Sequence, residues 1–355
     1  MRMKRIPSIL ALVLMLIFLT GCGHGAVLPA QTPEGDSGVS RTVFAMDTVM
    51  ELSPQGEHAK EACELGEARI HELESLLSVT IEDSEIYAAN HAQGRPVKLS
   101  PDVQTLLSDA LYWCGETDGA LDISIYPVLR TWGFTTGEYR VPEDAELEAL
   151  LKNVDYTRVD LNCDSGTVTL PEGMEIDLGS VAKGYTGDVM MQVFRDAGVT
   201  SGMISLGGNV QVLGTKPDGS DWRIAVQDPN GDGFVGIVEV SDKAVITSGG
   251  YERFFEKDGV TYWHILDPET GKSAHSGVVS ATVVGKSGTM CDALSTALFV
   301  MGPERASEFW KTHAGDAFDY ILVLEDGSLV ITEGVESRFT TVDSWANARI
   351  EVIRR

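Results

Sequence analysis

Three short segments of this 355-residue sequence hold residue types that could act on a phosphate-bearing substrate. In the first, EIDLGSVAKGY at residues 175–185, Asp177 ends an apolar run and Lys183 follows a glycine-containing turn at the expected start of a helix. Backbone N–H groups at such a turn, joined by a lysine, can bind a phosphate. The alternative is a turn that carries a surface lysine, because the segment does not match a Walker A motif.

The second segment, CDALSTALFVMG at residues 291–302, brings oxygen atoms together on an expected helix. Asp292 and Thr296 are four residues apart, so their side chains project from one face, and the Ser295 carbonyl lies close by. Oxygen ligands of mixed type, without His or Cys, suit a hard cation such as Mg²⁺. The alternative is an Asp near a helix N-terminus with a Thr on the solvated side.

The third segment, TYWHILDPETG at residues 261–271, places His264 between an aromatic and an aliphatic residue in an expected strand. The ordinary pKa of histidine lies near neutrality, so this side chain can act as a general base. A histidine in such surroundings can equally be a packed core residue. The residues alone leave both interpretations open.

The surrounding pattern predicts an α+β protein with a mixed sheet and packed helices, because strands and helices do not alternate regularly. Apolar spacing predicts helices between residues 56 and 79, from 142 to 154 and from 183 to 197. Two further helices are expected on either side of Gly302, at residues 291–301 and 303–312. Short strands separated by glycine-containing turns account for most of the second half of the chain.

Charge and cysteine content exclude several classes of function. The net charge of −26 argues against nucleic acid or an anionic lipid surface as a partner. An anionic ligand must therefore be held by local groups, such as a metal ion. Beyond Cys22, the cysteines are widely spaced and form no CxxC pair, so they predict neither a zinc site nor a disulfide scaffold.

The first forty residues have the pattern of an export signal followed by a tether. Basic residues precede the apolar stretch from Ile9 to Leu19, which is too short to span a bilayer, and LTGC at residues 19–22 resembles a bacterial lipobox. We therefore expect a signal peptide at residues 1–21, lipidation of Cys22 and attachment to the extracytoplasmic face of the cell membrane. A flexible tether at 22–40, a domain at 41–340 and a C-terminal tail at 341–355 complete the expected organisation.

Seven segments resemble, in order along the chain, the motifs of the ApbE family of FAD:protein FMN transferases. They are AMDT, DGALD, DLGSVAKGY, SLGGN, TSGGYERFF, HILDPETG and DALSTALFVMG. The resemblance runs from about Thr42 to Thr332 and implies an ApbE-like, T-fold-like mixed sheet in two lobes with the FAD site between them. The sequence departs from the family pattern at Asp47, where the family usually has Gly.

The resemblance also implies which residues bind the substrate and the metal. FAD would be bound by residues spread along the chain, namely Met46, Ala120, Leu121, Asp122, Asp177, Lys183 and Ile265. Mg²⁺ would be bound by a backbone oxygen of Ser180, the Asp292 carboxylate, the Ser295 carbonyl and Thr296. His264 and Asp292 would be the catalytic residues, with His264 as the candidate general base.

The implied reaction transfers FMN from FAD to a Thr or Ser hydroxyl of an acceptor flavoprotein, of the redox-pump or electron-transfer subunit type, and releases AMP. Two alternatives use the same residues. One is a Mg²⁺-dependent FAD pyrophosphatase in which water replaces the acceptor hydroxyl. The other is a non-catalytic FAD-binding lipoprotein, which would have no need of a metal beside the bond to be cut.

The lipobox generates a test of location. Because Cys22 is the expected site of lipid attachment, Cys22→Ala should move the protein from the membrane fraction to the soluble extracytoplasmic fraction. Fractionation followed by immunoblotting measures this, and an unchanged membrane fraction would remove the lipoprotein assignment.

Overall fold

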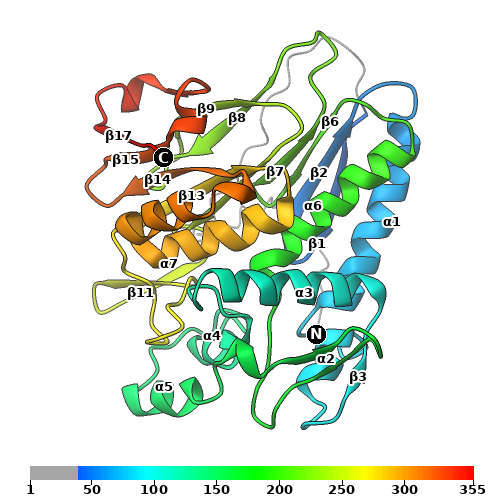
Figure 1. The fold of residues 1–355 in the computed structure, drawn as a ribbon, viewed down its shortest axis with the longest axis vertical. Coiled ribbons are helices and arrows are strands. Elements are labelled where there is room, and N and C mark those ends of the chain that lie inside the picture. The colour runs from blue at the N-terminus through cyan, green and yellow to red at the C-terminus, as the bar shows by residue number, and fades with distance from the viewer. Residues whose placement is uncertain (1–38) are drawn as a thin grey trace, which may run out of the picture. The chain divides into compact units, whose positions relative to one another are not determined.

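The computed structural model describes residues 39–355, and its largest sheet has nine strands. Figure 1 shows this sheet with the helices around it. Neighbouring strands in it are antiparallel except for the last pair, β15 and β17, which is parallel. In spatial order its strands are β1 (Arg41–Ala45), β2 (Thr48–Pro54), β6 (Gly202–Leu206), β7 (Asn209–Leu213), β10 (Ala244–Gly249), β13 (Val278–Gly285), β14 (Asp319–Leu324), β15 (Leu329–Thr332) and β17 (Ile350–Ile353). The α+β class with a mixed sheet is thus confirmed.

Alternation along the strands gives the middle of this sheet two buried faces. Ile246 and Val283 point into the main core beneath the helices, whereas their neighbours Val245 and Val284 point into a second core on the other face. A small sheet of β8 (Trp222–Gln227), β9 (Phe234–Val240) and β16 (Phe339–Thr341) covers that second face. A one-residue slip in register would therefore move the side chains of each core to the opposite face of the sheet.

Three long helices lie over the first face of the sheet (Figure 1): α1 (Ala59–Leu77), α6 (Gly179–Asp196) and α7 (Gly288–Thr312). The helix expected between residues 56 and 79 is confirmed as α1, and the two expected around Gly302 form α7, which is interrupted at that glycine with φ of 77°. α6 begins four residues before the predicted start at Lys183. Its first turn therefore lies next to Asp177.

The remaining elements are shorter, the longest being α3 with 16 residues. They are α2 (Glu85–Asn90), β3 (Val97–Lys98), α3 (Pro101–Glu116), α4 (Tyr126–Trp132), α5 (Asp144–Leu151), β4 (Asp160–Asn162), β5 (Thr167–Thr169), β11 (Phe254–Lys257), β12 (Val260–Trp263) and α8 (Glu333–Glu336). β11 and β12 form a separate two-stranded hairpin, and β3, β5 and β4 form a three-stranded sheet.

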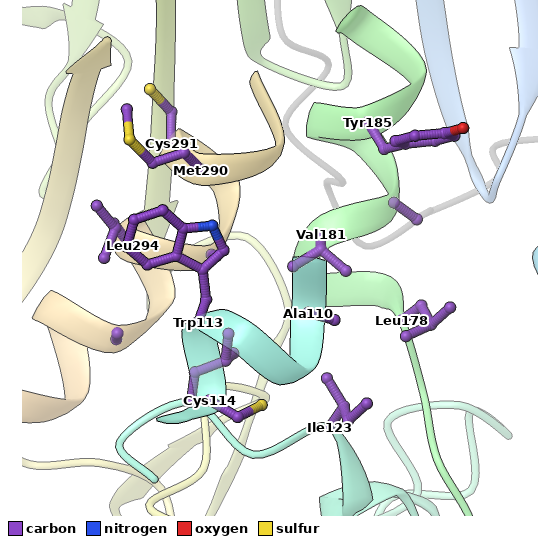
Figure 2. Close-up of a cluster of buried hydrophobic side chains, with 14 of the residues drawn as sticks. Ala110, Trp113, Cys114, Ile123, Leu178, Val181, Tyr185, Met290, Cys291 and Leu294 are labelled. Carbon is purple, nitrogen blue, oxygen red and sulfur yellow. The ribbon is translucent and has the colours of Figure 1, made fainter. Parts of the chain in front are cut away.

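One continuous core joins the long helices to α2 and α3, whereas α4 and α5 contribute to a separate, smaller cluster. Figure 2 shows Trp113 of α3 lying toward Leu294 of α7, with Val181 of α6 on the other side of α3. The described residues fold as one compact unit, in which this core connects the two lobes expected from the sequence. Of the cysteines in the described part, Cys63, Cys114 and Cys291 are buried and Cys163 is exposed, and all four are free.

Both ends of the chain bear on the expected organisation. Residues 341–355, expected to form a tail, instead carry β17, which extends the main sheet beside β15. The signal peptide, Cys22 and nearly all of the tether fall outside the described residues. No helix within residues 39–355 has both the length and the apolar composition needed to cross a membrane.

Two glycines allow α6 and α7 to cross at backbone contact. A Cβ on Gly184 would lie 2.2 Å from the carbonyl oxygen of Gly288, and a Cβ on Gly288 would lie 2.4 Å from that of Gly184. No side chain fits at either position without separating the helices. The glycine after Lys183 is therefore a requirement of helix packing.

This crossing generates a test of stability. Gly184→Ala should lower the free energy of unfolding by about 2 kcal/mol or more, because the methyl group overpacks a backbone contact that cannot move aside. Gly115→Ala is the matched control, because Gly115 lies in α3 with nothing within 4 Å of its added Cβ. There the same change should raise stability by roughly 0.5–1 kcal/mol. Denaturant unfolding of both variants measures the effect, and equal shifts in one direction would contradict the packing argument.

Candidate active site

The predicted chemical residues converge where α6 begins and α7 makes its first turns. Two tight hairpin turns of the main sheet, at residues 46–47 and 207–208, adjoin each other, since a Cβ on Gly207 would touch the Thr48 side chain. Asn209, just after the second turn, bonds to Asp292 of α7. The β11–β12 hairpin brings His264 to the same region, where the charge of Lys183 acts on it.

Asp292 is a buried carboxylate held by two donors. Its Oδ2 accepts the Gly184 N–H at 2.8 Å, and its Oδ1 accepts the Asn209 amide at 2.9 Å. The side chain is 3% exposed, and among residues 39–355 no cation pairs with it within 4.0 Å. Burial raises the pKa of this carboxyl, and the charge of Lys183 partly opposes the shift.

Hydroxyl groups gather one turn further along α7. The Ser248 hydroxyl of β10 lies 2.8 Å from that of Ser295 and 3.2 Å from that of Thr296. The Ser295 hydroxyl in turn donates to the Asp292 carbonyl oxygen at 2.9 Å. Ser248 therefore joins the Ser295 and Thr296 hydroxyls from the sheet, one turn of α7 beyond Asp292.

The start of α6 supplies backbone donors and a carbonyl. The Asp177 carboxylate accepts the Gly179 N–H and so caps the first turn. In a regular helix, Gly184 would donate to the Ser180 carbonyl, but its N–H is bonded to Asp292. The Ser180 carbonyl therefore keeps acceptor capacity close to the buried carboxylate.

Lys183 is the cation common to the whole site. Its charge opposes the rise in the pKa that loss of hydration causes at Asp177, Glu252 and Asp292. It also adds to the fall in the pKa of His264. Within residues 39–355, its ammonium group makes no ion pair or hydrogen bond. A cation so placed, with no partner of its own, suits an anionic ligand.

His264 is neutral at physiological pH. Desolvation, followed by the charges of Arg253 and Lys183, lowers its pKa to about 3. Its backbone N–H donates to the Arg253 carbonyl at 3.1 Å, and Nδ1 lies 3.3 Å from the same oxygen. A proton on Nδ1 would satisfy that contact and leave Nε2 as the free basic nitrogen. Its ring also stands edge-on to Phe134, with centroids 6.3 Å apart.

The turn at Met46 and Asp47 explains the departure from the family pattern. Both residues have positive φ, 51° and 58°, which a two-residue turn between twisted strands requires. Glycine is the usual residue at a position with positive φ, and Asp is among the few other residues that tolerate this conformation. Glu74 of α1 fixes the turn by accepting the Met46 N–H at 2.6 Å.

The residues of the DGALD segment that are expected near FAD bond to or pack against other parts of the protein. Asp122 accepts the Ser124 N–H and hydroxyl, at 2.8 and 2.6 Å, and the Tyr156 N–H at 3.2 Å. Ala120 and Leu121 are buried in the main core, as is Ile265, which follows His264. The Asp122 side chain therefore holds the loop in place.

Sequence reasoning assigned no role to four polar residues of this region, Asn209, Ser248, Glu252 and Arg253, of which it singled out only Ser248. All lie within segments quoted for the family resemblance, SLGGN and TSGGYERFF, so the signal was present there. Glu252 is exposed, yet protein around its carboxyl limits hydration and raises its pKa to about 7, with Lys183 opposing the shift.

These residues fit Mg²⁺. A buried carboxylate without a paired cation is unfavourable unless a cation binds beside it. The groups next to Asp292 are hydroxyl and carbonyl oxygens, the ligand type that Mg²⁺ prefers. No group of three or more His, Cys, Asp or Glu side chains that could hold a metal occurs in the described part of the chain. The oxygen ligands next to Asp292 favour a hard cation over zinc.

The chain is similar to proteins of known activity over most of its length. The family model described as the ApbE family matches residues 46–320. A FAD:protein FMN transferase of Vibrio cholerae is 36% identical over 242 residues, covering 66% of this chain and 72% of the relative. One of Treponema pallidum is 32% identical over 292 residues, covering 78% of this chain and 80% of the relative.

Solved structures agree. The ApbE protein of Thermotoga maritima aligns with a TM-score of 0.81 and 31% identity over 85% of this chain and 99% of its own. The flavin transferase ApbE from Vibrio cholerae aligns with a TM-score of 0.72 and 27% identity over 87% and 98%. Because the family match extends from the Met46 turn through the α7 site to Tyr320, and the fold matches as well, this chain belongs to the ApbE family.

Proposed function

We propose that this chain transfers FMN from FAD to a Thr or Ser hydroxyl of an acceptor protein and releases AMP. The observation that carries the proposal is the convergence of three groups at one place: the uncompensated Asp292 carboxylate, the unpartnered Lys183 ammonium and the neutral His264 imidazole. Phosphoryl transfer needs a metal site, a cation that binds phosphate and a proton acceptor. The names of the relatives support the same reaction.

His264 takes the proton in this scheme. The acceptor hydroxyl gives its proton to Nε2 as its oxygen forms a bond to the FMN phosphorus. The bond between that phosphorus and the oxygen of the AMP phosphate breaks, and AMP leaves with the electron pair. Since Nε2 is unprotonated at neutral pH, it can accept the proton, and phosphate charge nearby would raise its low pKa toward the useful range.

The other residues bind and orient the substrate. Lys183 and the positive end of the α6 helix dipole hold the pyrophosphate. The Asp292 carboxylate, the Ser180 and Ser295 carbonyls and the Thr296 hydroxyl would hold Mg²⁺. Bound there, Mg²⁺ would offset the negative charge that develops on the pyrophosphate. Met46 and Asp177 would line the flavin side of the site. Ala120, Leu121, Asp122 and Ile265, which are buried, would support that side from within the protein.

The acceptor and the location belong to the same proposal. A lipid on Cys22 would hold the enzyme on the extracytoplasmic face of the membrane, within reach of a membrane-bound redox-pump or electron-transfer subunit. The sequence from Arg2 to Cys22 supports this anchoring.

The function and its metal site can be tested together. Wild-type protein incubated with FAD, Mg²⁺ and an acceptor domain should add the mass of an FMN phosphoester to that domain, whereas Asp292→Asn should add none. Mg²⁺ should also raise the melting temperature of wild type but not of Asp292→Asn, because a ligand stabilises only the protein that binds it. Mass spectrometry and thermal unfolding give the two measurements.

Asp188→Asn is the matched control for a lost carboxylate. Asp188 accepts the N–H groups of Gly288 and Thr289 at 2.7 and 2.9 Å, which caps α7 without touching the proposed metal ligands. This variant should be less stable, yet Mg²⁺ should still raise its melting temperature.

The products of the wild-type assay decide between the functions. AMP formed without flavinylated acceptor would favour the pyrophosphatase, and bound FAD without AMP would favour the carrier. A Mg²⁺ shift retained by Asp292→Asn would contradict the metal site.

The role of His264 as a base predicts that binding and chemistry separate. His264→Asn keeps a polar side chain and should keep FAD affinity, but it should slow FMN transfer by about two to four orders of magnitude. Single-turnover AMP release and FAD titration on one preparation measure both quantities. His275→Asn is the control, because His275 is exposed and packs on Trp263 with ring centroids 4.4 Å apart. Near-normal AMP release from His264→Asn would rule out the base.

A further inference from the structure

Arg253 is a second cation at the site, and the mechanism above gives it no role. Within residues 39–355 its guanidinium group makes no hydrogen bond and no ion pair, although most arginines in this acidic protein bond to a carboxylate or a carbonyl. A guanidinium group offers five N–H donors in a planar fork that matches a phosphate. Donors left free beside an anion site are available to a ligand.

The backbone ties Arg253 to His264. The Arg253 carbonyl receives the His264 N–H at 3.1 Å and faces Nδ1 at 3.3 Å, just before Phe254 pairs with Trp263 at the open end of the β11–β12 hairpin. Two contacts to one carbonyl fix the position of the imidazole relative to residue 253. The backbone of residue 253 therefore lies beside the imidazole, and the Arg253 charge is one cause of the low pKa of His264.

Arg253 and Lys183 act on the same groups of the site. The charges of both affect the pKa of Asp177, Glu252 and His264. Because electrostatic interaction falls with distance, the Arg253 charge lies near the groups that surround the base.

A pyrophosphate has two phosphates to place in this arrangement. The attacking and leaving oxygens lie roughly in line on opposite sides of the phosphorus, so a base that serves the attacking hydroxyl is remote from the departing AMP. The phosphate nearest His264 is then the one that stays with the flavin. The guanidinium group of Arg253 would donate hydrogen bonds to the non-bridging oxygens of that phosphate while its phosphorus is attacked.

We propose that Arg253 is a phosphate-binding residue that holds the flavin-side phosphate of FAD beside His264, and that this contact selects phosphorylated flavins over riboflavin. The proposal rests on the proposed function, because it uses the position of His264 as base. It assigns the metal side of the pyrophosphate to Lys183 and the flavin side to Arg253. The net charge of −26 gives such local cations added importance, since the rest of the molecule repels an anion.

Binding measurements without an acceptor test the proposal. Arg253→Gln should weaken the binding of FAD and FMN by roughly 10- to 100-fold, the usual loss for a hydrogen bond to a charged group, while riboflavin binding stays unchanged. Arg253→Lys keeps the charge but loses the fork, so its affinities should fall between those of wild type and Arg253→Gln. Inorganic pyrophosphate should compete less well with FAD in Arg253→Gln than in wild type.

Arg223→Gln is the matched control, because Arg223 lies exposed on β8, in another sheet, and contacts only Glu239 at 3.7 Å. It should bind all three flavins as wild type does, and thermal unfolding checks that every variant is folded. Unchanged FAD and FMN affinity in Arg253→Gln would overturn the proposal and leave the transferase function standing. Equal weakening of riboflavin would overturn it as well, because the effect would then not depend on phosphate. A wild-type protein that never labels an acceptor would instead contradict the transferase, while these affinities would still decide the role of Arg253.

Discussion

The site depends on the crossing of α6 and α7 at Gly184 and Gly288. At this point the two backbones touch, because neither residue has a Cβ to hold them apart. The contact places the Gly184 N–H within 2.8 Å of the Asp292 carboxylate, which a side chain at either position would prevent. Helix packing and the chemistry of the site are thus set by one interaction, and a loss of packing there would also move the carboxylate.

Electrostatics explain why this acidic protein can accept an anionic substrate. The chain has a net charge of −26, yet Lys183 and Arg253 form no ion pair with a carboxylate of residues 39–355. Asp292 is a buried carboxylate that pairs with no cation in the same part of the chain. An anionic substrate that arrives with Mg²⁺ would supply partners both to the cations and to the carboxylate, which favours binding of the pair over either alone.

Carboxylates of one type have different roles here because their partners differ. Asp122 and Asp188 bond to several backbone N–H groups and hold loops and helix ends. Asp292 bonds to one N–H and one amide and keeps lone pairs on both oxygens for a ligand. Asp47 contributes through its backbone, because it adopts the positive φ that the turn requires. Residue type alone does not distinguish a binding Asp from a structural one.

The sequence by itself determined the α+β class, most helices, the break at Gly302 and the face shared by Asp292 and Thr296, because apolar period, turn residues and helical spacing are local properties. Its motif order also indicated the family. Tertiary structure alone decided that Asn209 and Gly184 bond to Asp292, that β17 extends the sheet and that Arg253 lies with His264. These contacts join residues that are distant along the chain, and most depend on how helices cross and hairpins fold back. No local pattern records that geometry, so only the packed chain determines which of its many acids and cations meet.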